Sequence, residues 1–405
     1  MYVTKRLSEY QRNPSELTLL PTEGPNSGVL VIQDEESQPT CCFGKCFDCD
    51  LNGLPFPQNT KVTVKYQTGT GDDRIVLLDR VALIPVLHQP PSSNLYYVIR
   101  RSGKHTGKYS NPKRVIFCTG FTSLKFCSEA CVSAKEGDRA SCCICFTYVS
   151  NATPRPLDPF DIYQQFEIHQ KGSSTQKFFA TSVASDGIPP RFLRRKGWAV
   201  SFSSSQDYGL VDDAKGVDVK LRNELPDIYK GVVVGKWYVP FLFVKEGDAK
   251  DQMQNFMFYS MTLHQRFEEV FFCENVDNKH CEVVVDVEVE TEVVKLEGEK
   301  IASETKGVDS DGVVWFSVSG TEKIGLGSVV LERMKWEEER FGWLKKDDQM
   351  KSSIKRSEKF EGDGKHWKSY RCYVLVETFE LTRIDGTLVL TYEFRHADKL
   401  KSKWD

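Results

Sequence analysis

No stretch of this chain is long and apolar enough to form a membrane-spanning helix. The longest apolar segment, Val232–Val244, is interrupted by Gly235, Lys236 and Pro240, and a spanning helix needs about 20 apolar residues. The chain begins MYVTKRLSEYQRNP, without the apolar core of a secretory signal. These absences predict a cytoplasmic protein without a transmembrane helix.

The sequence also lacks the short motifs of common enzyme classes. It contains no Walker loop, nucleophile elbow, HExxH motif or Gly-rich dinucleotide fingerprint. Its seven histidines are scattered, and no two of them have the i, i+4 spacing of a metal pair. We therefore predict a non-enzymatic protein that has no catalytic residues and no organic cofactor.

A strong net charge is missing as well. The chain has 54 Lys and Arg against 57 Asp and Glu, for a net charge of −3, so no overall positive field attracts nucleic acid or anionic lipid. The local exception is RFLRRKGW at 191–198, which contains Arg191, Arg194, Arg195 and Lys196. Arginines between aromatic residues bind phosphates and stack on bases. This segment is a candidate phosphate or nucleic-acid patch; the alternative is a solvated surface paired with carboxylates.

Length and composition indicate a folded protein with more than one domain. The 405 residues are 40% hydrophobic and 27% charged, which is ordinary for globular proteins. The closely spaced prolines of PRPLDP at 154–159 are typical of a boundary. We predict a Cys-rich mixed β region at 1–153, a mixed α/β region at 154–250 and a long-stranded antiparallel β region at 251–405.

The segment CEVVVDVEVETEVVKL at 281–296 has the clearest pattern in the chain. Valines occupy positions 283, 285, 287, 289 and 293, and Asp286, Glu288, Glu290 and Glu292 lie between them. Alternation at period two predicts one long strand with an apolar and an acidic face. The apolar positions change phase near Val293–Val294, which indicates a β-bulge. The acidic face can be the solvent side of a sheet, a channel lining or a cation site.

Two further patterns predict local structure. Asp385-Gly386 separates VLVETFELTRI from TLVLTYEF, and such a pair between alternating runs favours a β-hairpin. Val211, Ala214, Val217, Leu221 and Leu225 fit one stripe of a helix that Pro226 ends. The predicted fold class is β-rich α+β, with a Cys-rich N-terminal half and a C-terminal half of long antiparallel strands that ends in the hairpin.

Cysteines are numerous, and most lie early in the chain. Of the 13 cysteines, 10 precede residue 150. Two CxxC pairs, Cys46/Cys49 and Cys142/Cys145, carry the thiolates that zinc prefers. Their separation is far beyond that of an ordinary zinc ribbon, and buried free thiols are the alternative. The sequence thus leaves open a zinc-stabilised scaffold held by these four residues.

Several long segments resemble the land-plant family called domain of unknown function 1262. They are MYVTKRLSEYQRNP with EGPNSGVLVIQDEE, CCFGKC, LPFPQNTKVTVKY, PRPLDPFDIYQQFEI, PPRFLRRKGW, VVVGKWYVPFLFVKEG and DGTLVLTYEFRH. The resemblance runs over nearly the whole chain and is weakest from Ser102 to Ala140. It implies a plant protein and assigns no activity and no catalytic residues.

Two functional hypotheses from different classes follow. The first is a binding or interaction protein of the plant cytosol, with a protein partner and a role in stress or defence that the family type suggests. The second is an aerolysin-like pore-forming protein with membrane lipid as its partner, because the family is also associated with an insecticidal-toxin-like label. The latter is a fold-level analogy, and it assigns an amphipathic hairpin to residues 282–320.

Overall fold

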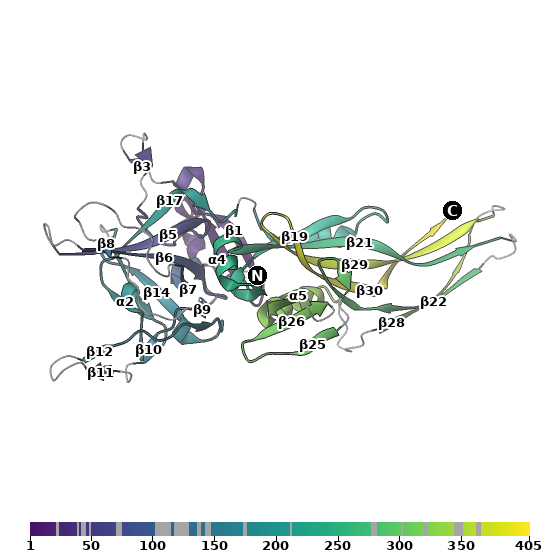
Figure 1. Cartoon of the computed structure of the whole chain (residues 1–405). Coiled ribbons are helices and arrows are strands. Elements are labelled where there is room, and N and C mark those ends of the chain that lie inside the picture. The colour runs from purple at the N-terminus through teal and green to yellow at the C-terminus, as the bar shows by residue number, and fades with distance from the viewer. Residues whose placement is uncertain are drawn as a thin grey trace.

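The chain folds into an elongated molecule with a broad lobe at one end and a narrow arm at the other (Figure 1). Strands dominate and most of their pairings are antiparallel, which confirms the predicted β-rich character. The computed structural model describes residues 1–21, 24–38, 40–41, 46–47, 50–69, 75–101, 115–116, 129–135, 139–141, 147–172, 176–210, 213–276, 282–300, 303–318, 322–343, 351–361 and 366–405.

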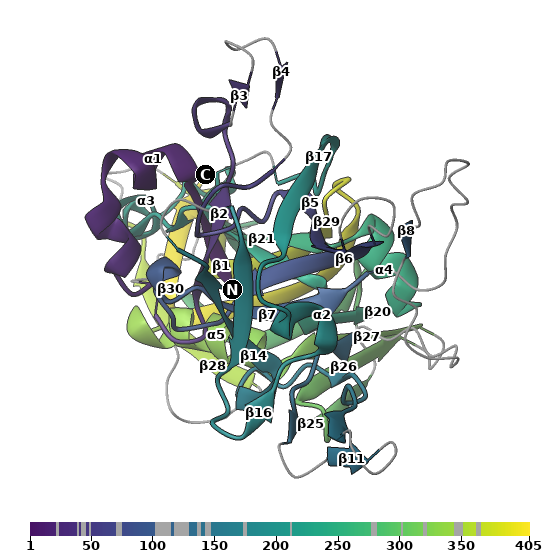
Figure 2. The ribbon, with the colours of Figure 1, turned by 90° about the vertical axis from the view of Figure 1, so that its left-hand side faces the viewer.

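The lobe is built on a sheet that Figure 2 shows from its outer end. Within the described residues this sheet has seven strands, in the order β15 (Phe178–Ser182), β14 (Gln165–Gln170), β7 (Leu95–Arg100), β6 (Ile75–Pro85), β5 (Thr60–Thr68) and β17 (Ala199–Asp207), with β8 (Val115–Ile116) beside β6. Val, Ile, Tyr and Phe are frequent in these strands, as is usual for strands that pack on both faces.

A second sheet starts beside the lobe and continues into the arm. Among the described strands it has nine, in the order β2 (Gly28–Ile32), β1 (Tyr2–Arg6), β19 (Val232–Pro240), β21 (Phe258–Glu274), β29 (Ser369–Arg383), β30 (Leu388–Trp404), β23 (Glu292–Leu296) and β24 (Glu299–Lys300), with β18 (Gly216–Val217) beside β19. The strands β21, β29 and β30 have 15 to 17 residues, against about 5 or 6 in an average strand. Their far halves form the arm.

The other elements surround these two sheets. A further sheet, four-stranded as described, has the order β20 (Val244–Glu246), β27 (Glu322–Gly327), β26 (Val313–Val318) and β25 (Ser303–Val308), and β22 (Glu282–Glu290) pairs with β28 (Lys351–Lys359). The α-helices are α1 (Leu7–Arg12), α2 (Arg191–Arg194), α3 (Val219–Glu224), α4 (Ala249–Asn255) and α5 (Ser328–Arg340). Short 3-10 helices cover Pro14–Thr18, Glu35–Ser37, Pro91–Ser93, Ile162–Gln164 and Phe241–Phe243. Two-residue and three-residue strands pair as β3 (Thr40–Cys41) with β4 (Cys46–Phe47), β9 (Glu129–Ala130) with β13 (Arg155–Pro156), β10 (Ala134–Lys135) with β16 (Gly187–Ile188), and β11 (Arg139–Ser141) with β12 (Thr147–Val149).

The largest hydrophobic core lies where the lobe meets the second sheet. Strand β6 shows how it forms, because both of its faces are buried. Ala82 and Ile84 belong to the core shared with Trp237 of β19. Val81 and Leu83 belong to a second core inside the lobe. An apolar run without alternation is what such a two-sided position requires.

The structure corrects the prediction of one long strand at 281–296. The chain bends at Thr291, so that β22 ends at Glu290 and β23 begins at Glu292. Strand β22 pairs with β28, whereas β23 pairs with β30. The change of phase near Val293–Val294 therefore marks a change of sheet and not a bulge, because each strand buries its apolar side chains against a different partner.

The helix expected from the stripe between Val211 and Leu225 is also shorter than predicted. It begins only at Val219, and the side chain of Asp218 accepts a hydrogen bond of 3.0 Å from the backbone N–H of Leu221. Gly216–Val217 instead pairs with β19. Strand pairing thus overrides the helical periodicity here, and Val211 lies outside the described residues.

The long strands β29 and β30 are joined by a tight turn that contains Asp385 and Gly386. Gly386 has a φ of +89°, a region that favours glycine. The backbone N–H of Thr387 donates to Asp385 Oδ1 over 2.9 Å.

Across the residues that the structure describes, we find no helix that combines the length and the apolar character needed to cross a membrane.

Candidate functional site

The strands β22 and β28 form an amphipathic pair that lies against the arm (Figure 1). They are antiparallel, and their register runs from Glu282 opposite Lys359 to Glu290 opposite Lys351. On β22 the odd-numbered valines at 283, 285 and 289 are buried, whereas Val284 is 65% exposed. The predicted apolar face is therefore real and points inward.

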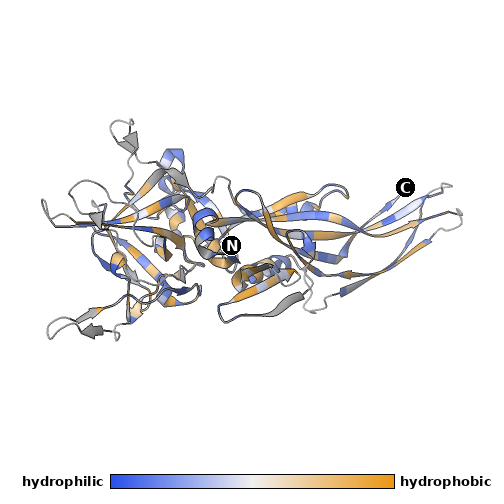
Figure 3. Ribbon diagram, viewed as in Figure 1, coloured by the Kyte–Doolittle hydropathy of each residue, from blue (hydrophilic) through white to orange (hydrophobic). Residues whose placement is uncertain are grey.

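The acidic face of β22 points to solvent and is matched by lysines of β28. Asp286 lies 3.5 Å from Lys355, and Glu288 lies 3.8 Å from Lys351. Exposed pairs of this kind contribute about 0 to 1 kcal/mol each. The interpretation as the solvent side of a sheet thus agrees with the structure better than a cation site does. Figure 3 shows the asymmetry of the pair, with most apolar residues on β22 and most hydrophilic ones on β28.

The inner face of the β22–β28 pair packs on one side of the arm. Its buried valines and Ile354 share a core with residues of β29, namely Tyr370, Cys372, Val374 and Val376. Each fully buried valine adds about 1.5 kcal/mol or more to the free energy of unfolding. Two paired strands without further support are only marginally stable in water. The position of the pair therefore depends on this apolar contact.

A buried cluster of charged residues, which we call the Arg222 cluster, lies where the arm begins. Arg222 of α3 is fully buried. Its Nε donates to Glu377 Oε1 over 2.9 Å and its Nη2 donates to Glu338 Oε1 over 2.9 Å. Its Nη1 contacts the backbone carbonyl of Glu337 over 3.2 Å. One guanidinium thereby connects α3, α5 and the central long strand β29.

Aromatic and amide groups complete the surroundings of Arg222. The ring of Phe341 lies 4.0 Å and that of Trp343 lies 4.8 Å from its Cζ, which favours a cation. Gln265 of β21 donates to Glu377 Oε1 over 2.8 Å. Arg333 and Arg340 both bind Glu337, so Glu338 and Glu377 share Arg222 as their main cation.

Two carboxyls that share one guanidinium retain a proton. Burial is the main cause that raises the pKa of Glu338 to about 7 and the pKa of Glu377 to about 8. Burial also lowers the pKa of His396, so its imidazole is neutral. Glu338 Oε2 lies 3.1 Å from His396 Nε2, where a protonated carboxyl can donate its hydrogen. The pair titrates as a unit near neutral pH.

The same three side chains offer ligands that a metal ion can use. One ligand atom each from Glu338, Glu377 and His396 lies within 4.8 Å of the others, and all three residues are buried. Zinc accepts carboxylate and imidazole ligands. However, Arg222 already supplies a positive charge to both carboxylates, and a divalent ion beside it would be repelled. The arrangement fits a shared proton better than a metal.

The proton in the Arg222 cluster makes stability depend on pH. A carboxyl with a raised pKa in the folded state adds stability below its unfolded value of about 4.5, and this stability is lost as the pH rises through the folded value. Because this stability is lost between the unfolded and the folded pKa values, we expect the melting temperature to fall between about pH 5 and about pH 8. In Glu338→Gln an amide replaces the protonated carboxyl, and we expect this fall to become smaller. Thermal unfolding over this pH range measures it.

An exposed carboxyl provides the control for this experiment. Glu288→Gln removes an exposed carboxylate on β22 and is expected to leave the pH dependence of unfolding unchanged. Equal pH profiles for wild type and Glu338→Gln would contradict the shared proton.

The predicted basic patch is present at the end of the lobe. Arg191 and Lys196 are exposed, Arg194 and Arg195 are partly buried, and Phe192 and Leu193 are buried. Arg194 donates to the backbone carbonyl of Val149 over 3.0 Å, and Arg195 lies 5.0 Å from the ring of Tyr66. Arg191 and Arg195 lie close enough to Arg194 to lower its pKa, and the role of the four cations as a phosphate or nucleic-acid patch stays a prediction.

The predicted zinc ligands fall largely outside the described residues. Cys49, Cys142 and Cys145 are not among these residues, and Cys46 is described only as part of the short strand β4. The zinc hypothesis therefore stays a prediction. Among the described cysteines, Cys131 and Cys372 are buried free thiols.

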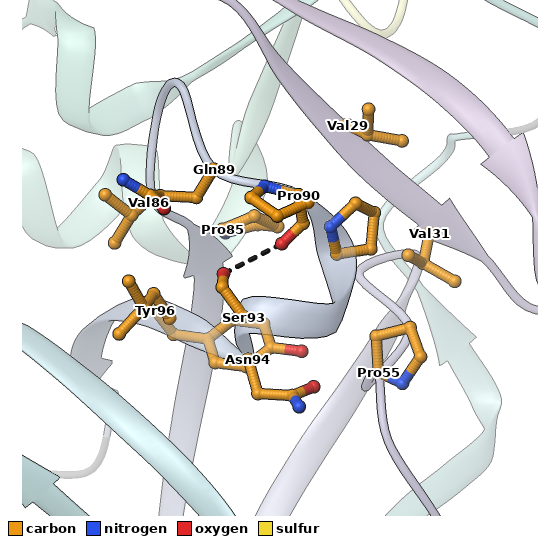
Figure 4. A pocket seen from close by; sticks show the side chains of 12 residues that line it. Val29, Val31, Pro55, Pro85, Val86, Gln89, Pro90, Ser93, Asn94 and Tyr96 are labelled. Atoms are coloured by element: carbon orange, nitrogen blue, oxygen red, sulfur yellow. Dashed lines mark hydrogen bonds between the residues drawn. The ribbon is translucent and has the colours of Figure 1, made fainter. Parts of the chain in front are cut away.

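The cavities give no sign of a catalytic centre within the described residues. The recess in Figure 4 has a volume of about 10 Å³ and is lined mostly by prolines, valines and backbone near Ser93 and Pro90, which is room for about one water. A wider groove of about 530 Å³ is lined by residues including Tyr10, Leu17 and Leu54. Glu36 is its sole carboxylate among those lining residues.

Sequence analysis missed the Arg222 cluster. Arg222 and Glu377 are 155 positions apart, and each sits in a segment that also fits an exposed surface. The one available signal is Glu377 within the otherwise apolar VLVETF, because an acid at a core position of a strand needs a buried partner.

Comparison with known proteins gives limited information. A family model described as "Protein of unknown function (DUF1262)" matches residues 23–118, about a quarter of the chain. The expected resemblance is thus supported for this part only, and the match extends into the segment from Ser102 that looked least typical. No curated protein matches the sequence.

Among solved structures, the chain is similar to one described as "Crystal structure of Cry35Ab1". The TM-score is 0.42 at 10% sequence identity, and the alignment covers 86% of this chain and 90% of that chain. A similarity of this size establishes neither a shared fold nor a shared activity.

Proposed function

We propose that this chain is a non-enzymatic, membrane-binding protein of the β-pore-forming type. In this proposal the β22–β28 pair leaves the arm and exposes its apolar face to lipid. The observation that carries the proposal is the burial pattern of β22, in which valines at 283, 285 and 289 are covered by the arm while their neighbours Val284, Asp286 and Glu288 face water.

The dimensions of the pair support this proposal. Each of its strands has nine residues, and a membrane-crossing β-strand needs about 9 to 11. Strand β22 also has the alternation of apolar and polar positions that such a strand requires, whereas β28 has Ile354 as its one apolar residue. The sequence prediction placed the amphipathic hairpin at 282–320; the structure instead pairs β22 with β28, whose residues come after 350.

The Arg222 cluster supports the proposal by providing an anchor. Helix α5 precedes β28 in the chain, and its Glu338 is bound by Arg222 of α3. Breaking this contact removes one link between α5 and β29, and with it one of the constraints on β28. The apolar contact with Val374 and Val376 is a second constraint, and the hydrogen bond from Ser402 of β30 to Glu358 of β28 is a third.

Dye release from vesicles that contain an anionic lipid tests the proposed function. We expect leakage, together with a large oligomer in size-exclusion chromatography of the same sample. A protein that leaves vesicles intact and keeps its elution volume would contradict the proposal. The valines of β22 would then be ordinary core, and the interaction-protein hypothesis would take its place.

A further inference from the structure

We propose that the basic patch of Arg191, Arg194, Arg195 and Lys196 is the surface by which this protein docks onto anionic lipid headgroups. The inference rests on the proposed function, because it names the class of membrane that the protein selects. The patch and the β22–β28 pair share no residue, so each step can be tested without the other.

The first observation is that these four cations have no carboxylate partner among the described residues. Their side chains contact neutral groups: a backbone carbonyl for Arg194, the ring of Tyr66 for Arg195 and the ring of Phe179, at 5.7 Å, for Lys196. The nearby acid Asp79 is buried and bound by Arg100. Most other arginines of the chain have a carboxylate within 4 Å, so this patch is left for an external anion.

The second observation is that further positive charge surrounds the patch. The exposed Lys177 lies beside the patch. It comes directly before Phe178, whose backbone N–H donates a hydrogen bond to the carbonyl of Trp198. Burial lowers the pKa of Arg194 most, and the charges of Arg191 and Arg195 lower it further. Like charges held together in this way favour a bound counter-anion.

The chemistry of the patch fits a headgroup layer better than a nucleic acid. The cations lie on one short helix and the turn after it, which form no element that enters a groove. The partly exposed rings of Tyr66 and Phe179 suit the polar-apolar boundary of a bilayer. Clusters of four to eight Lys and Arg are typical of anionic-lipid surfaces.

The position of the patch separates docking from insertion. In Figure 1, α2 lies at the end of the molecule opposite to β22, and Figure 2 shows α2 on the outer face of the lobe. Docking through the patch therefore does not by itself bring the β22–β28 pair to the bilayer. Binding without leakage is an expected state of the protein when the pair is held in place.

Flotation of the full chain with vesicles tests the inference. We expect binding to phosphatidylcholine vesicles that contain phosphatidylserine, loss of this binding at high salt, and no binding to phosphatidylcholine alone. The double variant Arg191→Glu/Lys196→Glu should bind at least about 30-fold more weakly, because each lost cation weakens binding by about fivefold. Lys220→Glu/Lys230→Glu, an equal charge change at exposed positions of α3 and the loop after it, should bind like the wild type.

The outcomes distinguish this inference from the proposed function. Equal binding by both double variants, or equal binding to neutral vesicles, would overturn the patch as the docking surface even if leakage occurs. Salt-sensitive binding without leakage would support the patch and contradict pore formation. Preference for a single-stranded RNA over the anionic vesicles would overturn the lipid assignment. Unchanged melting temperatures of both variants show that the fold is retained.

Discussion

Replacing Arg222 with methionine is expected to lower the free energy of unfolding by about 3 to 5 kcal/mol, which corresponds to a fall of about 4 to 6 °C in melting temperature for a chain of 405 residues. The guanidinium is fully buried and contacts Glu337, Glu338 and Glu377. Methionine fills a similar volume but leaves these acids without their shared cation. A buried charge that has lost its partner is among the most destabilising changes in a protein.

A double-mutant cycle separates this charge effect from packing. Arg222→Met/Glu377→Gln removes one acid together with the cation, so it should be less destabilised than the sum of the two single variants. Lys220→Met, an exposed substitution on the same helix, should change stability by less than about 0.5 kcal/mol. Thermal unfolding measures all four proteins. Additive effects, or a loss below about 1 kcal/mol for Arg222→Met, would show that the Arg222 cluster is not a structural anchor.

Replacing Val285 with aspartate is expected to detach the β22–β28 pair from the arm at a cost of about 3 kcal/mol or more. Val285 is fully buried and shares a core with Val374 and Val376. A carboxylate at this position cannot be solvated while the strand stays in place. Residues 282–290 and 351–359 should then exchange backbone hydrogens faster than in the wild type and become sensitive to protease.

The adjacent position supplies the matched control. Val284 is 65% exposed on the same strand, and Val284→Asp should change stability by less than about 0.5 kcal/mol. The two variants also differ in the vesicle assay, because Val285→Asp places a charge on the face proposed to meet lipid and should abolish leakage. Similar behaviour of the two variants would rule out the inward position of Val285.

The strand faces were predictable from the sequence because they depend on local geometry. Successive side chains of a strand point to opposite sides, so the alternation in 281–296 gave the buried and exposed sides of β22 without any tertiary information. The break at Thr291 was not predictable in this way. A bulge and a change of sheet produce the same shift of phase, and only the partners β28 and β30 distinguish them.

The basic patch was also predictable, because its four cations lie within six consecutive positions. The lack of an acidic partner among the described residues was not predictable, since any carboxylate of the chain can fold back onto these cations. The same reason hid the lysines of β28 that face the acids of β22, such as Lys355 opposite Asp286.

The sequence alone determined the β-rich character, the amphipathic side of β22 and the clustered cations, because each depends on neighbours a few positions apart. Only the tertiary structure decided that Arg222 is buried with Glu338 and Glu377, and that the apolar side of β22 rests on β29. Contacts over more than a hundred positions, such as that between Arg222 and Glu377, are set by how the long strands and α5 pack. A single charged residue in the sequence does not show whether water or another charge will surround it.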